Sequence, residues 1–217
     1  MIEVNHNKTP LIRSLGYFDT SMISKNIKQL KDSDWDRPEY FEANYNKGKH
    51  LALHQTQHII FKFANKQHQE IQYFELPIWT EWEPLLLPLM EKITEVYGYA
   101  HGFFPKVMLA KLPASSFIPP HVDGNERGYA PHKVHLPIHT NTECHFFLDG
   151  NRYQLEAGQA YEINNGLKHS VINKGNTDRI HLIFEYIDVN IQSEELKKSI
   201  NNYFELHRNT QKMNSGE

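Results

Sequence analysis

The chain has 217 residues with 39% hydrophobic, 12% aromatic and 23% charged residues and a formal net charge of −3. This balance is typical of a globular domain and excludes a disordered or fibrous chain. No run of Lys or Arg could neutralise a row of phosphates, so we expect no nucleic-acid partner. No segment approaches the roughly 20 apolar residues that cross a bilayer, so we expect no membrane anchor. The single cysteine, Cys144, excludes an intramolecular disulfide and indicates a reducing compartment, so we predict a cytoplasmic protein.

The first half of the chain shows signals for two helices and two strands. Residues 1–50 are polar, with a short helix expected over 21–30 and a turn near Pro38. Alternation of apolar and polar residues predicts strands over 58–64 and 71–76. A helix with Thr80 as its N-cap is predicted over 80–100. Apolar residues at helical spacing are expected to form one face of this helix, namely Leu85, Leu86, Leu89, Ile93 and Val96.

After residue 102 the sequence becomes a succession of short strands separated by turn signals, spaced by about 8 to 15 residues. This pattern favours an antiparallel β-sandwich or barrel with flanking helices. We therefore expect one domain over residues 1–217, with a core barrel at about 51–188. The N-terminal segment 1–50 and an amphipathic helix at about 192–208 are expected to pack on this barrel.

The stretch IPPHVDG contains His121 and Asp123, whose spacing at the end of a strand places both side chains on one face. For this pair alone, a polar surface turn is an equally good interpretation. His169, which begins a later strand in NGLKHSVIN, supplies a third donor. Two histidines and one carboxylate are the donor set that non-haem iron(II) oxygenases use, with open positions left on the ion. We predict that the three residues bind a metal.

A second group of polar residues is predicted to face the inside of the barrel. Arg179 and His181 share one face of a strand, and Lys133, His135 and His139 share one face of another. A buried arginine requires an anion, and its guanidinium matches the shape of a carboxylate. The pattern indicates a polar pocket that takes a carboxylate ligand.

The order of His121-x-Asp123, KVHLPI, GQAYEINN, His169 and Arg179 resembles the aspartyl/asparaginyl β-hydroxylase family of iron(II)- and 2-oxoglutarate-dependent oxygenases, over about residues 100–188. The resemblance implies a double-stranded β-helix, which is a jelly-roll, cupin-like fold. It also implies that Fe(II) and 2-oxoglutarate are the cofactors and that O2 is a substrate.

The resemblance assigns roles residue by residue. The matched positions imply that His121 and His169 are metal ligands. They imply that Arg179 binds the distal carboxylate of 2-oxoglutarate and that His135 and Lys133 are pocket residues near the co-substrate. The chain departs from the protein-hydroxylating members, which have glycine at the position of Asp123 and serine at that of Ala110. Lys133 stands where those members have arginine, so it keeps the charge and loses the bidentate fork.

The reaction that the resemblance implies is hydroxylation of an unactivated C–H bond of an amino acid or of an Asp/Asn-type peptide residue, with release of succinate and CO2. VHLPIHTN and residues 179–182 are also similar to free-proline hydroxylases, so a small molecule and a peptide both remain open as substrates. Candidate substrate contacts are Trp35, Arg37, His54, Asn125 and Arg127. The alternative is a cupin-type metal-binding isomerase or small-molecule sensor that does not use 2-oxoglutarate. The oligomeric state stays open.

Overall fold

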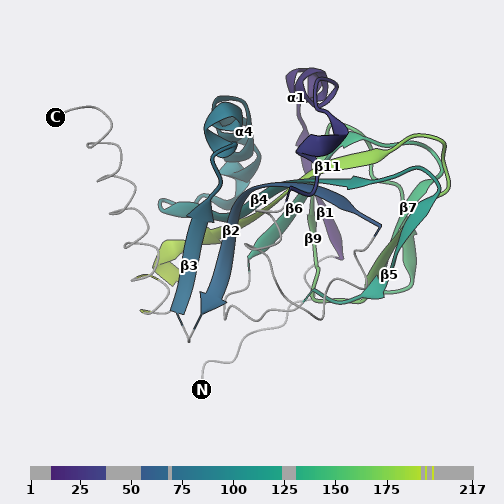
Figure 1. Ribbon diagram of the computed structural model, residues 1–217. Coiled ribbons are helices and arrows are strands. Elements are labelled where there is room, and N and C mark those ends of the chain that lie inside the picture. The colour runs from purple at the N-terminus through teal and green to yellow at the C-terminus, as the bar shows by residue number, and fades with distance from the viewer. Residues whose placement is uncertain are drawn as a thin grey trace.

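The computed structural model describes residues 11–37, 55–67, 70–123 and 131–191, together with residues 194 and 197. About half of these residues lie in strands (Figure 1). The strands are β1 (Ile12–Tyr17), β2 (Gln57–Gln67), β3 (Glu70–Glu75), β4 (Gly102–Leu112), β5 (Ser116–His121), β6 (His132–His139), β7 (Cys144–Leu148), β8 (Asn151–Tyr153), β9 (Gln159–Ile163), β10 (His169–Asn173) and β11 (Arg179–Asp188). The helices are α1 (Ser21–Ile27) and α4 (Trp79–Thr94), with single 3₁₀ turns η1 (Asp32–Asp34), η2 (Glu95–Tyr97) and η3 (Val189–Ile191).

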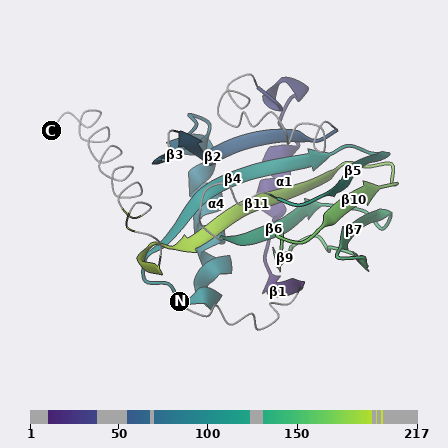
Figure 2. The ribbon, with the colours of Figure 1, turned by 90° about the horizontal axis from the view of Figure 1, so that it is seen from below.

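The described strands form two antiparallel sheets. The larger sheet has seven strands in the order β1-β9-β6-β11-β4-β2-β3, and the smaller has four in the order β5-β10-β7-β8. From β4 to β11 the chain passes back and forth between the two sheets, except that β7 and β8 form a hairpin within the small sheet, and this is the winding of a jelly roll. Figure 2 shows β4, β11 and β6 side by side in the large sheet, with β5, β10 and β7 at one end of the molecule. The expected double-stranded β-helix is confirmed.

Both helices lie on the same face of the large sheet (Figure 1). Alternate residues of the central strands face these helices, because side chains alternate along a strand. Leu136 and Phe184 are fully buried in this layer against Trp79 of α4 and Ile23 of α1. Burial of each side chain of this size contributes about 1.5–3 kcal/mol, so this layer anchors the large sheet.

A second apolar layer fills the space between the two sheets. Its buried members are Leu112, Ile118, Cys144, Phe146, Leu148, Leu155, Tyr161, Ile163 and Val171. The layer joins β5, β7 and β10 of the small sheet to β4 and β9 of the large one. The small sheet is thereby fixed with the ends of β5 and β10 next to the interior face of β6.

Several local expectations needed correction. Strand β1 was not expected; it is an edge strand that pairs with β9, and its register shifts between Ser14 and Gly16. The helix predicted over 80–100 is confirmed as α4, but its N-cap is Ile78 and Thr80 lies inside the helix. Val96 is 53% exposed after the helix has ended, so it does not belong to the apolar face. Within the described residues no helix is both long and apolar enough to cross a membrane.

His139 does not share the interior face with Lys133 and His135 as the alternation predicted. The pairing of β6 with β11 shifts register between Ile180 and His181, which turns the end of β6 over. The Nε2 atom of His139 instead lies 2.8 Å from the hydroxyl of Ser24 in α1. Of the segment 1–50, residues 11–37 are described, whereas residues 1–10 and 38–50, with the turn expected near Pro38, lie outside the described part. The proposed helix at 192–208 also lies outside it except for residues 194 and 197, and the assignment of a single domain stays a prediction.

Candidate metal centre and co-substrate pocket

Two neighbouring strands of the small sheet bring the two candidate metal-binding histidines together. His121 is the last residue of β5, and His169 is the first residue of β10 and lies directly opposite it in the antiparallel register. Asp123 follows β5, and its backbone N–H donates to the carbonyl of Asn165 over 3.2 Å. Residues from distant parts of the sequence thus meet at one end of the barrel.

One oxygen of Asp123 faces both imidazoles. Its Oδ1 lies 3.6 Å from Nε2 of His121 and 3.8 Å from Nε2 of His169. One donor atom from each of the three residues lies within 4.8 Å of the others. Adjacent ligands about 2.1 Å from an octahedral ion are about 3 Å apart, so a small inward movement closes this set on a divalent metal. The donor set fits iron(II).

The backbone fixes which ring nitrogen of each histidine is available. The Nδ1 atom of His121 lies 2.9 Å from the carbonyl of Pro119, and that of His169 lies 2.9 Å from the carbonyl of Leu167. A carbonyl only accepts, so each Nδ1 carries the proton and donates it. Each Nε2 keeps its lone pair and points to Asp123, which is the arrangement that a metal ligand needs.

The charges around the centre keep Asp123 ionised. Burial by itself raises the pKa of this carboxyl, but the charge of Lys133 and the interaction with His121 outweigh it, and the pKa lies well below its usual range. The interaction with Asp123 raises the pKa of His121, whereas burial lowers the pKa of His169. A carboxylate beside two imidazoles therefore offers the charge and the lone pairs that a divalent cation binds.

A buried lysine, Lys133, lies between the carboxylate of the candidate metal centre and a second, buried carboxylate. The Nζ atom of Lys133 lies 3.5 Å from Oδ2 of Asp123 and 3.6 Å from Oε1 of Glu185. Lys133 and Glu185 are directly opposite each other on β6 and β11, and both are buried. A buried cation needs such partners, because an isolated charge in the interior is costly. The sequence suggested the inward lysine but not its glutamate.

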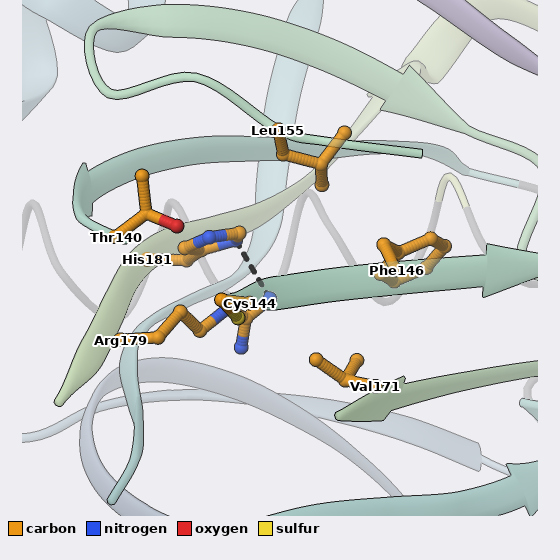
Figure 3. A pocket seen from close by; sticks show the side chains of 7 residues that line it. All are labelled: Thr140, Cys144, Phe146, Leu155, Val171, Arg179 and His181. Carbon is orange, nitrogen blue, oxygen red and sulfur yellow. Dashed lines mark hydrogen bonds between the residues drawn. The ribbon is translucent and has the colours of Figure 1, made fainter. Parts of the chain in front are cut away.

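A pocket deeper in the barrel surrounds Arg179 (Figure 3). It is lined by Thr140, Cys144, Phe146, Leu155, Val171, Arg179 and His181. Arg179 is 3% exposed, and its Nη2 donates to Nδ1 of His181 over 2.7 Å. Among the residues that the structure describes, no carboxylate forms an ion pair with this guanidinium. The pocket therefore holds a buried positive charge next to a neutral hydrogen-bond partner.

Burial controls the charge state of these groups. It lowers the pKa of Arg179 to about 10, so the guanidinium stays protonated at neutral pH. Burial, with the charge of Arg179 as a second cause, lowers the pKa values of His135 and His181 well below 6.5, so both imidazoles are neutral. The Nδ1 atom of buried His135 has no hydrogen-bond partner within the described part of the chain. This buried nitrogen is therefore available to bond to a water or to a ligand.

Phe146 links this pocket to the metal centre. Its ring lines the pocket of Arg179, and the same ring stacks on His169 with the centroids 5.9 Å apart. His135 lies 6.1 Å from the Phe146 ring and 5.7 Å from the His181 ring. A ligand that reaches from the metal to Arg179 thus runs along one aromatic ring.

The structure brings together six of the residues that the sequence singled out: His121, Asp123, His169, Lys133, His135 and Arg179. The candidate substrate contacts that the structure describes, Trp35 and Arg37, have partners outside this group of six residues. Trp35 is buried in the main core with the Nζ atom of Lys111 over its ring at 4.4 Å, and Arg37 pairs with Asp34 at 2.6 Å. A substrate role for these two residues stays a prediction. His54, Asn125 and Arg127 lie outside the described residues.

Comparison with known proteins gives one family and several structural neighbours. Residues 19–188 match the family described as aspartyl/asparaginyl beta-hydroxylase. A prolyl hydroxylase from Trichoplax adhaerens, solved with a peptide fragment of the hypoxia inducible factor oxygen degradation domain, is similar with a TM-score of 0.53 and 12% identity over 88% of each chain. No protein of curated function matches this sequence.

Two further structures are less similar. An oxidoreductase of the 2OG-Fe(II) oxygenase family from Burkholderia pseudomallei has a TM-score of 0.47 and 15% identity over 60% of this chain and 65% of its own. A prolyl-4-hydroxylase from Pseudomonas putida has a TM-score of 0.45 and 13% identity over 81% of this chain and 91% of its own.

The jelly roll with a His-Asp-His set at one end defines a protein of the oxygenase type. The family match covers most of the chain, and the chain belongs to the aspartyl/asparaginyl β-hydroxylase family. The protein is therefore a hydroxylase by family, and its His-Asp-His set could hold a metal ion.

Proposed function

We propose that this protein hydroxylates an unactivated C–H bond of a free amino acid or of an Asp/Asn-type peptide residue, and that it converts 2-oxoglutarate and O2 to succinate and CO2. One oxygen atom enters the new hydroxyl group and the other enters succinate. The observation that carries the proposal is Arg179, a buried cation without a carboxylate partner among the described residues. A dicarboxylate co-substrate supplies the missing anion, whereas a metal-dependent isomerase has no need of this cation.

In this proposal His121, Asp123 and His169 hold the metal through two Nε2 atoms and Oδ1. When bound, iron(II) with 2-oxoglutarate supplies the oxidising power that breaks the C–H bond. The residues of the chain bind and orient the reactants. The three residues would supply three ligands to the metal, and this number would leave room for a chelating 2-oxo acid and O2.

Arg179 would bind the distal carboxylate of 2-oxoglutarate with its planar fork. His181 holds the guanidinium in place through their hydrogen bond of 2.7 Å. Phe146, which lines the pocket of Arg179 and stacks on His169, would lie beside the path of the bound co-substrate. His135, with its unpaired Nδ1, and Lys133 lie beside this path, where they can bond to the chelating end of the co-substrate.

We also propose that the reaction takes place in the cytoplasm. The one cysteine of the sequence is a free, buried thiol, and burial raises its pKa, so it is protonated and unreactive. A reducing compartment preserves both this thiol and ferrous iron.

Coupled turnover tests the proposal. Iron(II)-loaded protein is incubated with 2-oxoglutarate, O2 and panels of amino acids and of Asp- or Asn-containing peptides, while succinate and the mass of each candidate substrate are measured. We expect one class to gain an oxygen atom and to release succinate in equal amount. His169→Ala should abolish both signals, whereas His145→Ala on the neighbouring strand β7 should retain them. Stimulated succinate release without any oxidised product would contradict hydroxylation.

A further inference from the structure

The two oxygens of Asp123 have different environments. Oδ1 faces the histidine nitrogens at 3.6 and 3.8 Å. Oδ2 accepts a hydrogen bond of 3.1 Å from the side-chain Nδ2 of Asn165, and Nζ of Lys133 lies 3.5 Å from it. The amide and the lysine thus draw Oδ2 away from the histidines and leave Oδ1 toward them.

Asn165 holds Asp123 at a second point as well. Its backbone carbonyl accepts the N–H of Asp123 over 3.2 Å. One residue therefore bonds to both the backbone and the carboxylate of a metal-binding candidate. This double attachment fixes the position of the side chain more tightly than either bond alone, because fewer rotations remain.

Asn165 lies in the turn between β9 and β10, and His169 is the first residue after this turn. The turn is closed by the hydrogen bonds from Leu167 N to Asn164 O over 3.3 Å and from Asn165 N to Ile163 O over 2.9 Å. The carbonyl of Leu167 accepts from Nδ1 of His169. A single short turn therefore orients two of the three donors, Asp123 through Asn165 and His169 through Leu167.

A carboxylate can bind a metal through one oxygen or through both, and the difference changes the number of positions left for other ligands. An oxygen that accepts a hydrogen bond from an amide and lies beside a lysine ammonium is less available to a metal. We propose that Asn165 is a positioning residue that holds Asp123 as a one-oxygen ligand, so that three positions of the ion stay open for co-substrate and O2. The inference rests on the metal site of the proposed function.

The test uses Co(II) as a spectroscopic probe in place of iron(II). Asn165→Ala removes the donor and the volume of the side chain, while Asn165→Leu removes the donor and keeps approximately the size. Asn164→Ala is the matched control, because no hydrogen bond between the described residues joins the Asn164 side chain to Asp123. Co(II) affinity and the visible d–d absorption, whose intensity reports the coordination number, are measured for each protein, with the melting temperature of the metal-free form.

We expect both Asn165 variants to bind Co(II) about 10- to 100-fold more weakly than the wild type and to show a changed d–d spectrum. Asn164→Ala should match the wild type, and the Leu variant should melt near the wild-type temperature without metal. Unchanged affinity and spectrum in both Asn165 variants, with or without a lower melting temperature, would overturn the inference while the metal site stands. If wild type binds Co(II) no better than Asp123→Ala, the metal site itself fails, and this inference fails with it.

Discussion

Replacement of Arg179 by methionine should change stability and co-substrate binding in opposite directions. Methionine is unbranched and of similar length but carries no charge. In the metal-free protein the guanidinium is buried, and burial lowers its pKa from 12.5 to about 10. A shift of this size means that the charged form opposes folding by about 3 kcal/mol. Loss of the hydrogen bond to His181 costs about 1 kcal/mol, so we expect Arg179→Met to be about 2 kcal/mol more stable than the wild type.

The effect on 2-oxoglutarate should have the opposite sign. Removal of one partner from a buried, hydrogen-bonded charge pair costs about 2–5 kcal/mol, which corresponds to about a 30- to 4000-fold loss of affinity. Urea unfolding of the metal-free proteins measures the first effect, and anaerobic calorimetry with 2-oxoglutarate measures the second. Arg152→Met, at an exposed position of β8, is the matched control and should change neither. Unaltered binding of 2-oxoglutarate, or a loss of several kcal/mol in stability, would refute a role of Arg179 as an anion receptor.

Three further substitutions test other parts of the structure. His181→Ala should weaken 2-oxoglutarate binding about 10- to 100-fold in calorimetry, because Arg179 loses its hydrogen-bond partner; equal affinity would show that His181 does not position the guanidinium. Leu109→Ala should lower the free energy of unfolding by about 2–5 kcal/mol in urea titrations, since this side chain is fully buried; a change below 1 kcal/mol would contradict close packing there. Burial raises the pKa of Glu162, but the bond to His132 outweighs it and the pKa lies below 4.5, so this carboxylate stabilises the fold above that pH. Glu162→Gln should therefore cost about 1–2 kcal/mol at pH 7, with the difference from wild type lost as the pH falls through the lowered pKa of Glu162; a difference that does not change with pH would exclude the charge of this carboxylate as its cause.

Much of the site was predictable because its signals are local. The i, i+2 spacing of His121 and Asp123 at a strand end fixes a common direction for two donors. Arg179 and His181 alternate with the apolar residues of β11, and the structure places them in one pocket with a hydrogen bond between them. The alternation also predicted correctly that Lys133 and His135 are inside the barrel, where both are buried.

The remaining features depend on contacts between distant segments. The sequence around Asn165 does not indicate that its side-chain amide donates a hydrogen bond to the carboxylate of Asp123, 42 positions earlier in the chain. His139 is on the opposite face from the one that the alternation predicts, because the register of β6 shifts next to Pro137 and reverses the alternation. Strand β1 has a mixed burial pattern without clear alternation, because it pairs at the edge of the large sheet. The sequence shows Glu185 only as a charged residue in a mostly apolar strand, and its partner Lys133 is identified only by the pairing of β11 with β6.

The measurement that tests the central claim most directly is an anaerobic titration of iron(II) into the purified protein with and without 2-oxoglutarate. A 2-oxo acid that chelates ferrous iron gives a visible metal-to-ligand charge-transfer band. We predict that this band appears in the wild type only when both cofactors are present, weakens in Arg179→Met and is absent in Asp123→Ala. Iron-loaded wild-type protein that gives no band with saturating 2-oxoglutarate would contradict the account and leave a metal-binding cupin that does not use this co-substrate.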